Sequence, residues 1–150
     1  NIGFLDRCDM AEDRNLLFKT LFFCRNIVHL SEPLYYYVQR NANSLTKQIN
    51  SDRVYEEISN ARDMVNFTNQ YQIDWLSPAD LSRFKFTIKS KLLFSLILSD
   101  FVNWKNIFPE SNDLIFKSNL RFRHQLLGYF ANNRFWFLIR LWLFWKKGLN

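Results

Sequence analysis

The stretch DRVYEEISNARDMVNFTNQY, residues 52 to 71, decides the fold class because its apolar residues recur at a helical spacing. Val54, Ile58 and Ala61 follow one another at intervals of three or four residues. Val65 continues the series, so one face of an α-helix would carry them all. Later segments show the same pattern, whereas strand-like runs stand only before residue 48. The sequence therefore predicts a mainly α protein with a small β component.

The first 48 residues are predicted to combine one helix with short strands. The helix is expected over residues 12–24, with Asp9 as its N-cap and Glu12 three residues later, an acidic variant of the capping box. Asp13 then lies in the first helical turn, where the helix dipole favours a negative charge. The expected strands are the apolar runs at residues 2–5, 27–30 and 34–38.

Further helices are predicted after residue 76. Ser77 is the expected N-cap of the first, with Pro78 at its first helical position and Asp80 in its first turn. Two shorter helices are expected at about residues 100–107 and 121–131, separated by the breaker Phe108-Pro109-Glu110.

Charge is concentrated at the C-terminal end of the chain. The whole chain carries a formal net charge of +6, and residues 117–150 contain four arginines and three lysines but no acidic residue. Such a segment indicates an anionic partner, either a phospholipid membrane or nucleic acid. The two cysteines, Cys8 and Cys24, fit neither a zinc site nor a disulfide framework, so the expected location is the cytoplasm.

The last predicted helix is unusually apolar. Residues 135–145 carry one charged residue, Arg140, and are too few to span a bilayer, which needs roughly 20. One interpretation is peripheral contact of residues 133–147 with the inner membrane face, because aromatic and cationic side chains suit the headgroup layer. The other is a central helix buried in the protein core.

Four short motifs stand in the first 48 residues. In order they are Ala11-Glu12-Asp13, Ile27-Val28-His29-Leu30, Glu32-Pro33-Leu34-Tyr35-Tyr36-Tyr37 and Asn43-Ser44-Leu45-Thr46. Together they resemble the second half of the catalytic domain in bacterial, non-processive family 2 glycosyltransferases, and the likeness covers about residues 2–48. It implies that this stretch is the second-half remnant of a GT-A α/β domain and that residues 51–150 form a helical C-terminal subdomain.

The resemblance also implies an activity. Family members transfer a sugar from a nucleotide-sugar donor to a glycan or lipid-linked acceptor, as in polysaccharide biosynthesis, with inversion at the anomeric carbon. Asp13 falls on the family's catalytic base, and Ala11 stands where the family usually has glycine. Glu12, Arg40 and Ser44 become candidate substrate-binding residues, the last two on the side of the donor phosphates.

The acidic Asp-x-Asp motif that holds a metal in this family does not occur in the sequence. A divalent cation, Mg²⁺ or Mn²⁺, is therefore expected in the full-length enzyme with ligands outside this chain, and these 150 residues alone are expected to be inactive. The alternative function is a non-enzymatic basic helical module that binds an anionic membrane or nucleic acid, nucleic acid being the less expected partner. His29 is expected to be half-buried in a strand, and His124 to be solvated or to face a phosphate.

Overall fold

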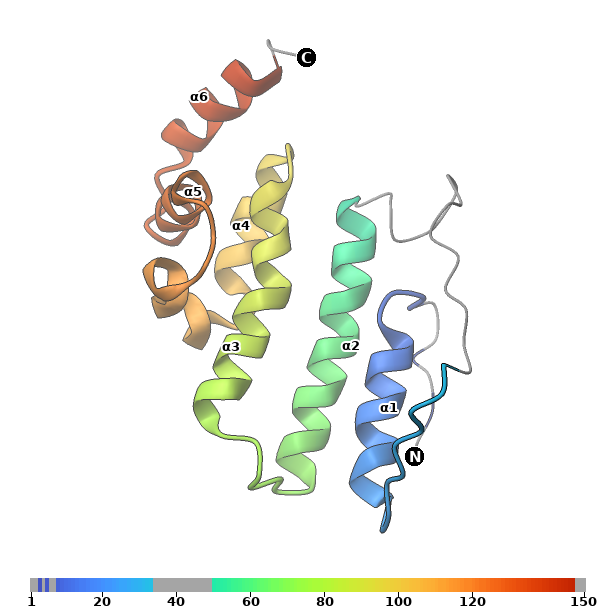
Figure 1. Ribbon diagram of the computed structural model, residues 1–150. Coiled ribbons are helices and arrows are strands. Elements are labelled where there is room, and N and C mark those ends of the chain that lie inside the picture. Colours follow the sequence, from blue (N-terminus) through green and yellow to red (C-terminus); the bar gives the residue numbers. More distant parts are fainter. Residues whose placement is uncertain (1–2, 4, 6–7, 34–49, 148–150) are drawn as a thin grey trace. The chain divides into compact units, whose positions relative to one another are not determined.

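The structure, a computed structural model, describes residues 3, 5, 8–33 and 50–147. The regular elements in these residues are all helices, so the mainly α prediction is confirmed (Figure 1). The chain divides into two compact units, residues 1–67 and 68–150. In chain order the α-helices and 3₁₀-helices are α1 (Glu12–Phe23), α2 (Ser51–Gln70), α3 (Pro78–Lys89), η2 (Ser90–Phe94), α4 (Leu98–Asn106), η3 (Pro109–Lys117), α5 (Phe122–Asn132) and α6 (Trp136–Lys147).

The strand predicted at residues 27–30 is wrong. These residues have no regular structure, and the side chains of Ile27, Val28 and Leu30 are exposed. A strand needs a neighbour to pair its backbone groups, and the part of the chain that the structure describes contains no strand that could supply one. The predicted strand at 34–38 lies outside the described residues, as does most of the one at 2–5.

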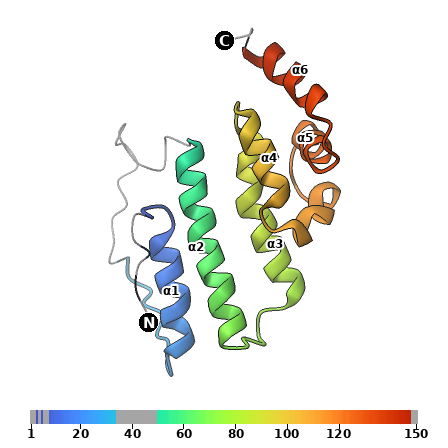
Figure 2. The ribbon, with the colours of Figure 1, turned by 180° about the vertical axis from the view of Figure 1, so that it is seen from behind.

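The first unit pairs α1 with α2 in parallel. Contacts advance along both helices together, from Arg14 with Glu57 to Phe22 with Phe67, and Figures 1 and 2 both show the two helices side by side. The face predicted for residues 52–71 is confirmed, because four apolar residues of α2 are buried, namely Val54, Ile58, Ala61 and Val65. Three phenylalanines at the end of α1 surround the ring of Phe67 in edge-to-face contacts, namely Phe18, Phe22 and Phe23.

The beginning of α1 differs from the prediction. The N-cap position is taken by Ala11, and Asp9 lies two residues farther upstream. No side chain caps this helix, so the predicted capping box is wrong. The backbone of Ala11 has φ 65° and ψ 21°, the left-handed conformation that glycine adopts most easily. Glu12 and Asp13 lie in the first turn as predicted.

In the second unit, unlike at the start of α1, the capping residues predicted from the sequence are confirmed. The Ser77 hydroxyl accepts a hydrogen bond from the Asp80 backbone N–H at 3.1 Å, and Pro78 opens α3, both as predicted. The two shorter helices are confirmed as α4 and α5. Pro109 does not simply break the chain: it begins η3, where a proline is tolerated because the first helical N–H needs no partner.

The core of the second unit surrounds Trp104, which is fully buried. Phe86 meets its ring edge-to-face at 6.4 Å between centroids. At Gly128 of α5, a Cβ atom would lie 3.6 Å from the Trp104 ring and 3.2 Å from Leu93. The missing side chain therefore lets α5 lie close to Leu93 of η2, while the Trp104 ring of α4 stands at ordinary van der Waals distance.

Candidate functional site

Asp13, the predicted catalytic residue, lies exposed in the first turn of α1. Its Oδ1 accepts a hydrogen bond from the Arg14 backbone N–H at 2.7 Å. A carboxylate in a first helical turn is stabilised in its charged form by the free amides and the helix dipole. Glu12 beside it is partly buried. The helix thus presents one accessible carboxylate at its N-terminal end.

A row of buried polar contacts, here called the polar seam, fixes α1 against α2. It consists of Asn15 and Lys19 from α1 with Asn60 and Asp63 from α2. The Asn15 side-chain amide donates to Asn60 Oδ1 at 2.9 Å and to Asp63 Oδ2 at 2.8 Å. The Lys19 ammonium forms a salt bridge with the same Asp63 carboxylate, and Asn15, Lys19 and Asn60 are all buried. Directional contacts of this kind allow one register between the helices.

The segment before α1 is held by the same face of α2. The Asp9 backbone N–H donates to Glu56 Oε2 at 3.1 Å, and the Asn60 amide donates to the Met10 carbonyl at 2.9 Å. Arg14 bonds Glu57 Oε1 at 2.9 Å. The polar seam and these contacts together position the first turn that carries Asp13.

Sequence reasoning missed this polar face of α2, although the signal was present. Glu56, Asn60 and Asp63 are spaced at helical intervals, as regularly as the apolar residues that predict the helix. A helix with one polar and one apolar face is usually read as solvated on the polar side. Here the polar side is covered by α1.

The structure does not show whether the other predicted site residues, Arg40 and Ser44, lie near Asp13. Arg40 and Ser44 lie outside the described residues. Among the residues that are described, no group of three or more His, Cys, Asp or Glu side chains could hold a metal ion. These residues therefore do not fit the divalent cation that the resemblance implies, and no step of the chemistry is assigned to it.

The opposite side of α1 carries exposed apolar residues beside the exposed polar residues Asp13 and Thr20. Leu17 and Leu21 are exposed although Asn15 and Lys19 are buried. Beyond the helix, the exposed residues Ile27 and Val28 add to the apolar surface of this unit. Exposed apolar residues in such number indicate a surface that another chain segment or molecule covers.

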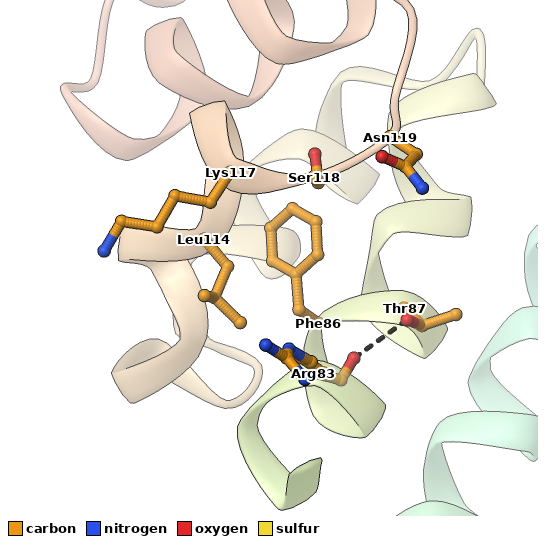
Figure 3. Close-up of a pocket in the computed structure, with 7 residues that line it drawn as sticks. All are labelled: Arg83, Phe86, Thr87, Leu114, Lys117, Ser118 and Asn119. Carbon is orange, nitrogen blue, oxygen red and sulfur yellow. Dashed lines mark hydrogen bonds between the residues drawn. The ribbon is translucent and has the colours of Figure 1, made fainter. Parts of the chain in front are cut away.

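The second unit contains a separate open pocket of about 360 Å³ between α3 and η3 (Figure 3). The Phe86 ring and Leu114 form its apolar part, while the Lys117 side chain extends away from the ring. The Thr87 hydroxyl already donates to the Arg83 carbonyl at 2.8 Å. Its lining includes neither a carboxylate nor an imidazole. Its lining residues are Arg83, Phe86, Thr87, Leu114, Lys117, Ser118 and Asn119.

Two buried ionisable side chains in the second unit have structural partners. Lys89 donates to the Ile107 and Phe108 carbonyls at 3.0 and 2.9 Å, and also to the side-chain oxygen of Asn112. His124 is buried against the Phe94 ring, with 4.2 Å between ring centres, so the prediction of a solvated histidine is wrong. Burial lowers the pKa of His124, and the neighbouring arginines lower it further.

His29 also differs from its prediction, because it is exposed and belongs to no strand.

The chain was compared with family models, with curated proteins and with solved structures. None of these comparisons gives a match.

Proposed function

We propose that this chain is part of an inverting glycosyltransferase and that Asp13 is its catalytic base. The observation that supports this most directly is the placement of Asp13. Its carboxylate is accessible in a first helical turn, while the helix behind it is fixed by the polar seam. A general base needs both properties, because the acceptor hydroxyl must be able to reach it and it must be held where that hydroxyl arrives.

The reaction is a single displacement. The acceptor hydroxyl oxygen attacks the anomeric carbon of the donor sugar, and Asp13 takes the hydroxyl proton as that bond forms. The bond from the anomeric carbon to the diphosphate breaks, and the nucleoside diphosphate leaves with the bonding electron pair. Attack from the opposite side inverts the anomeric configuration.

The finer assignment, a GT-A remnant over residues 1–48 followed by a helical subdomain over 51–150, rests on the sequence motifs. The exposed leucines of α1, Leu17 and Leu21, are in keeping with it. In the proposed enzyme, the sheet from the first half of the catalytic domain covers Leu17 and Leu21. The metal ligands and the nucleotide pocket belong to that half.

Backbone geometry at Ala11 adds a second point of agreement. The residue has a positive φ of 65° where the resembled family usually has glycine. The conformation is one that glycine adopts without strain. A glycine at this position would therefore adopt the backbone shape observed at Ala11 without strain.

The test is made on the complete coding product, including any sequence that flanks these residues. Release of nucleoside diphosphate is measured with UDP-glucose, UDP-N-acetylglucosamine and GDP-mannose, using bacterial membrane lipids as the acceptor. We expect turnover with at least one donor. Asp13→Asn should lower kcat by about 100-fold or more with little change in donor affinity, because the amide cannot accept the proton.

Asp52→Asn is the matched control, because Asp52 is also exposed in the first turn of a helix. It should retain the activity of the unmodified enzyme, and circular dichroism should show that both variants fold. If Asp13→Asn retained more than about a tenth of the activity, Asp13 would not be the catalytic base. Its role would then be limited to the helix terminus. Absence of turnover with all three donors contradicts the proposal as well.

A further inference from the structure

Helix α6 is divided lengthwise into a buried and an exposed face. Ile139 is 0% exposed and Leu143 is buried one turn later, while Trp142 meets Phe101 edge-to-face at 6.2 Å. On the other side, Phe137 and Phe144 are 75% and 79% exposed. The interpretation of α6 as a buried core helix therefore holds for one face only, since the other face is exposed.

The exposed side chains form a continuous apolar face. Phe137, Leu141 and Phe144 are separated by four and three residues, so they lie above one another along the helix. Trp145 extends this face by one position, and all four side chains are exposed. In both views α6 lies at the end of the second unit, beyond α5 (Figures 1 and 2). Keeping four large apolar side chains in water is unfavourable, which indicates that this face has a partner.

The charges around the face select that partner. Arg140 lies three residues after Phe137 and four before Phe144, and its side chain is exposed at the edge of the apolar face. Arg134, also exposed, stands just before the helix, and no acidic residue follows Lys117 in the sequence. A second copy of the chain would bring these arginines near their own equivalents. An anionic surface, in contrast, complements them.

The length of α6 determines how such a surface is met. Twelve residues at about 1.5 Å each make a helix of roughly 18 Å, short of the roughly 30 Å hydrocarbon core of a bilayer. Among the helices of the described residues, none combines the length and hydropathy that a membrane span requires. A short helix with one aromatic face and cationic edges suits the plane of the headgroup layer.

We propose that α6 docks the protein on an anionic phospholipid bilayer, lying in the plane of the membrane. Phe137, Leu141, Phe144 and Trp145 enter the boundary between headgroups and acyl chains. Arg134 and Arg140 reach lipid phosphates while their methylene stems follow the apolar face. Ile139 and Leu143 keep the helix attached to the second unit. This docking goes beyond the proposed sugar transfer, and its test requires no activity.

The first test is co-sedimentation of the full chain with vesicles. At low salt the protein should sediment with vesicles that contain about 30% phosphatidylglycerol and stay in the supernatant with pure phosphatidylcholine; added salt should release it. Arg140→Gln should weaken binding about fivefold, the typical contribution of one cation near an anionic leaflet. The double variant Phe137→Ser/Phe144→Ser should weaken it by about tenfold or more.

Phe122→Ser is the matched control, because Phe122 is equally an exposed phenylalanine of the second unit but lies outside α6. It should bind vesicles as the unmodified chain does. Since all the substituted phenylalanines are exposed, the variants should keep the helical circular dichroism signal.

The second test locates the helix in the bilayer. Lipids brominated on the acyl chain should quench tryptophan fluorescence, and Trp145→Phe should remove much of that quenching. Trp75→Phe should not, because Trp75 has a similar exposure, 64% against 62% for Trp145, but precedes α3. Any one of three results overturns the proposal: a chain that stays in the supernatant at low salt, binding that is equal on neutral vesicles, or a dimer in solution that the Phe137→Ser/Phe144→Ser variant dissociates.

Discussion

The Lys89 ammonium lies 4.5 Å from the centre of the Trp104 ring, and both side chains are fully buried. Removal from water lowers the pKa of Lys89 from its ordinary 10.5 to about 7, although the carboxylates of Glu110 and Asp113 raise it in part. The three oxygen atoms that accept hydrogen bonds from this ammonium come from the segment that joins α4 to η3 and from η3 itself. Lys89 therefore links α3 to that segment through the interior of the second unit.

The lowered pKa of Lys89 predicts a stability that rises with pH. Between about pH 7 and 10.5 the unfolded chain binds this proton and the folded chain does not, so the free energy of unfolding increases with pH in that window. From pH 7 to pH 9 the gain should be about 2 kcal/mol. Urea unfolding at both pH values measures it.

Lys89→Met identifies the source of this gain. In that variant the pH-dependent increase should be lost, whereas Lys117→Met, which removes an exposed lysine, should keep it. Equal pH dependence in the unmodified protein and Lys89→Met would show that Lys89 remains charged in the core throughout this range.

A second prediction concerns the polar seam. Asp63→Ala leaves the Lys19 ammonium buried without its carboxylate, and should lower the free energy of unfolding by about 3 kcal/mol. Asp52→Ala, at an exposed position of the same helix, should change it by less than about 1 kcal/mol. Replacing both partners, with Lys19→Met and Asp63→Leu, should recover much of the loss. Equal effects of the two alanine variants would mean that Lys19 does not depend on Asp63.

Ala11→Gly should stabilise the protein. Ala11 has a φ of 65°, a left-handed conformation that costs a non-glycine residue roughly 1 kcal/mol, and glycine removes that strain. Thermal unfolding should shift upward by about 2–4 °C. The same substitution at Ala79, an exposed residue in the first part of α3, should shift it downward, because glycine is a poor helix former. An unchanged or lower midpoint for Ala11→Gly contradicts the strain.

The helices could be predicted because their signals are local. Ser77 and Pro78 specify the start of α3 within one turn, and the apolar spacing of Val54 and Ile58 specifies a face of α2. The strand at residues 27–30 could not be judged in this way, since an apolar run of that length forms a strand only where another strand pairs with it. The first turn of α1 was correctly placed, but its left-handed entry at Ala11 has no marker in the residue type.

In the candidate site, too, local features could be predicted and contacts between distant residues could not. The position of Asp13 followed from the sequence, whereas the contacts that hold its helix did not. Lys19 and Asp63 are 44 residues apart, and the sequence around either residue does not indicate that the other is its partner. Lys89 is similar, because a lysine in an otherwise regular helix is normally expected in solvent. The role of Asp13, and those of Glu12, Arg40 and Ser44, remain predictions.

Because α1 and α2 run parallel, the chain must return from the end of α1 to its beginning before α2 can start. Only then can the contacts of the polar seam form. Its hydrogen bonds join residues 44 to 48 positions apart, whereas Lys89 and Asn112 are only 23 apart and Lys85 and Glu110 only 25. Contacts between distant residues form later in folding, because the entropy of loop closure is lost before they stabilise the chain. We therefore expect the second unit to fold first and α1 to dock last, so that the turn carrying Asp13 becomes ordered only when folding is nearly complete.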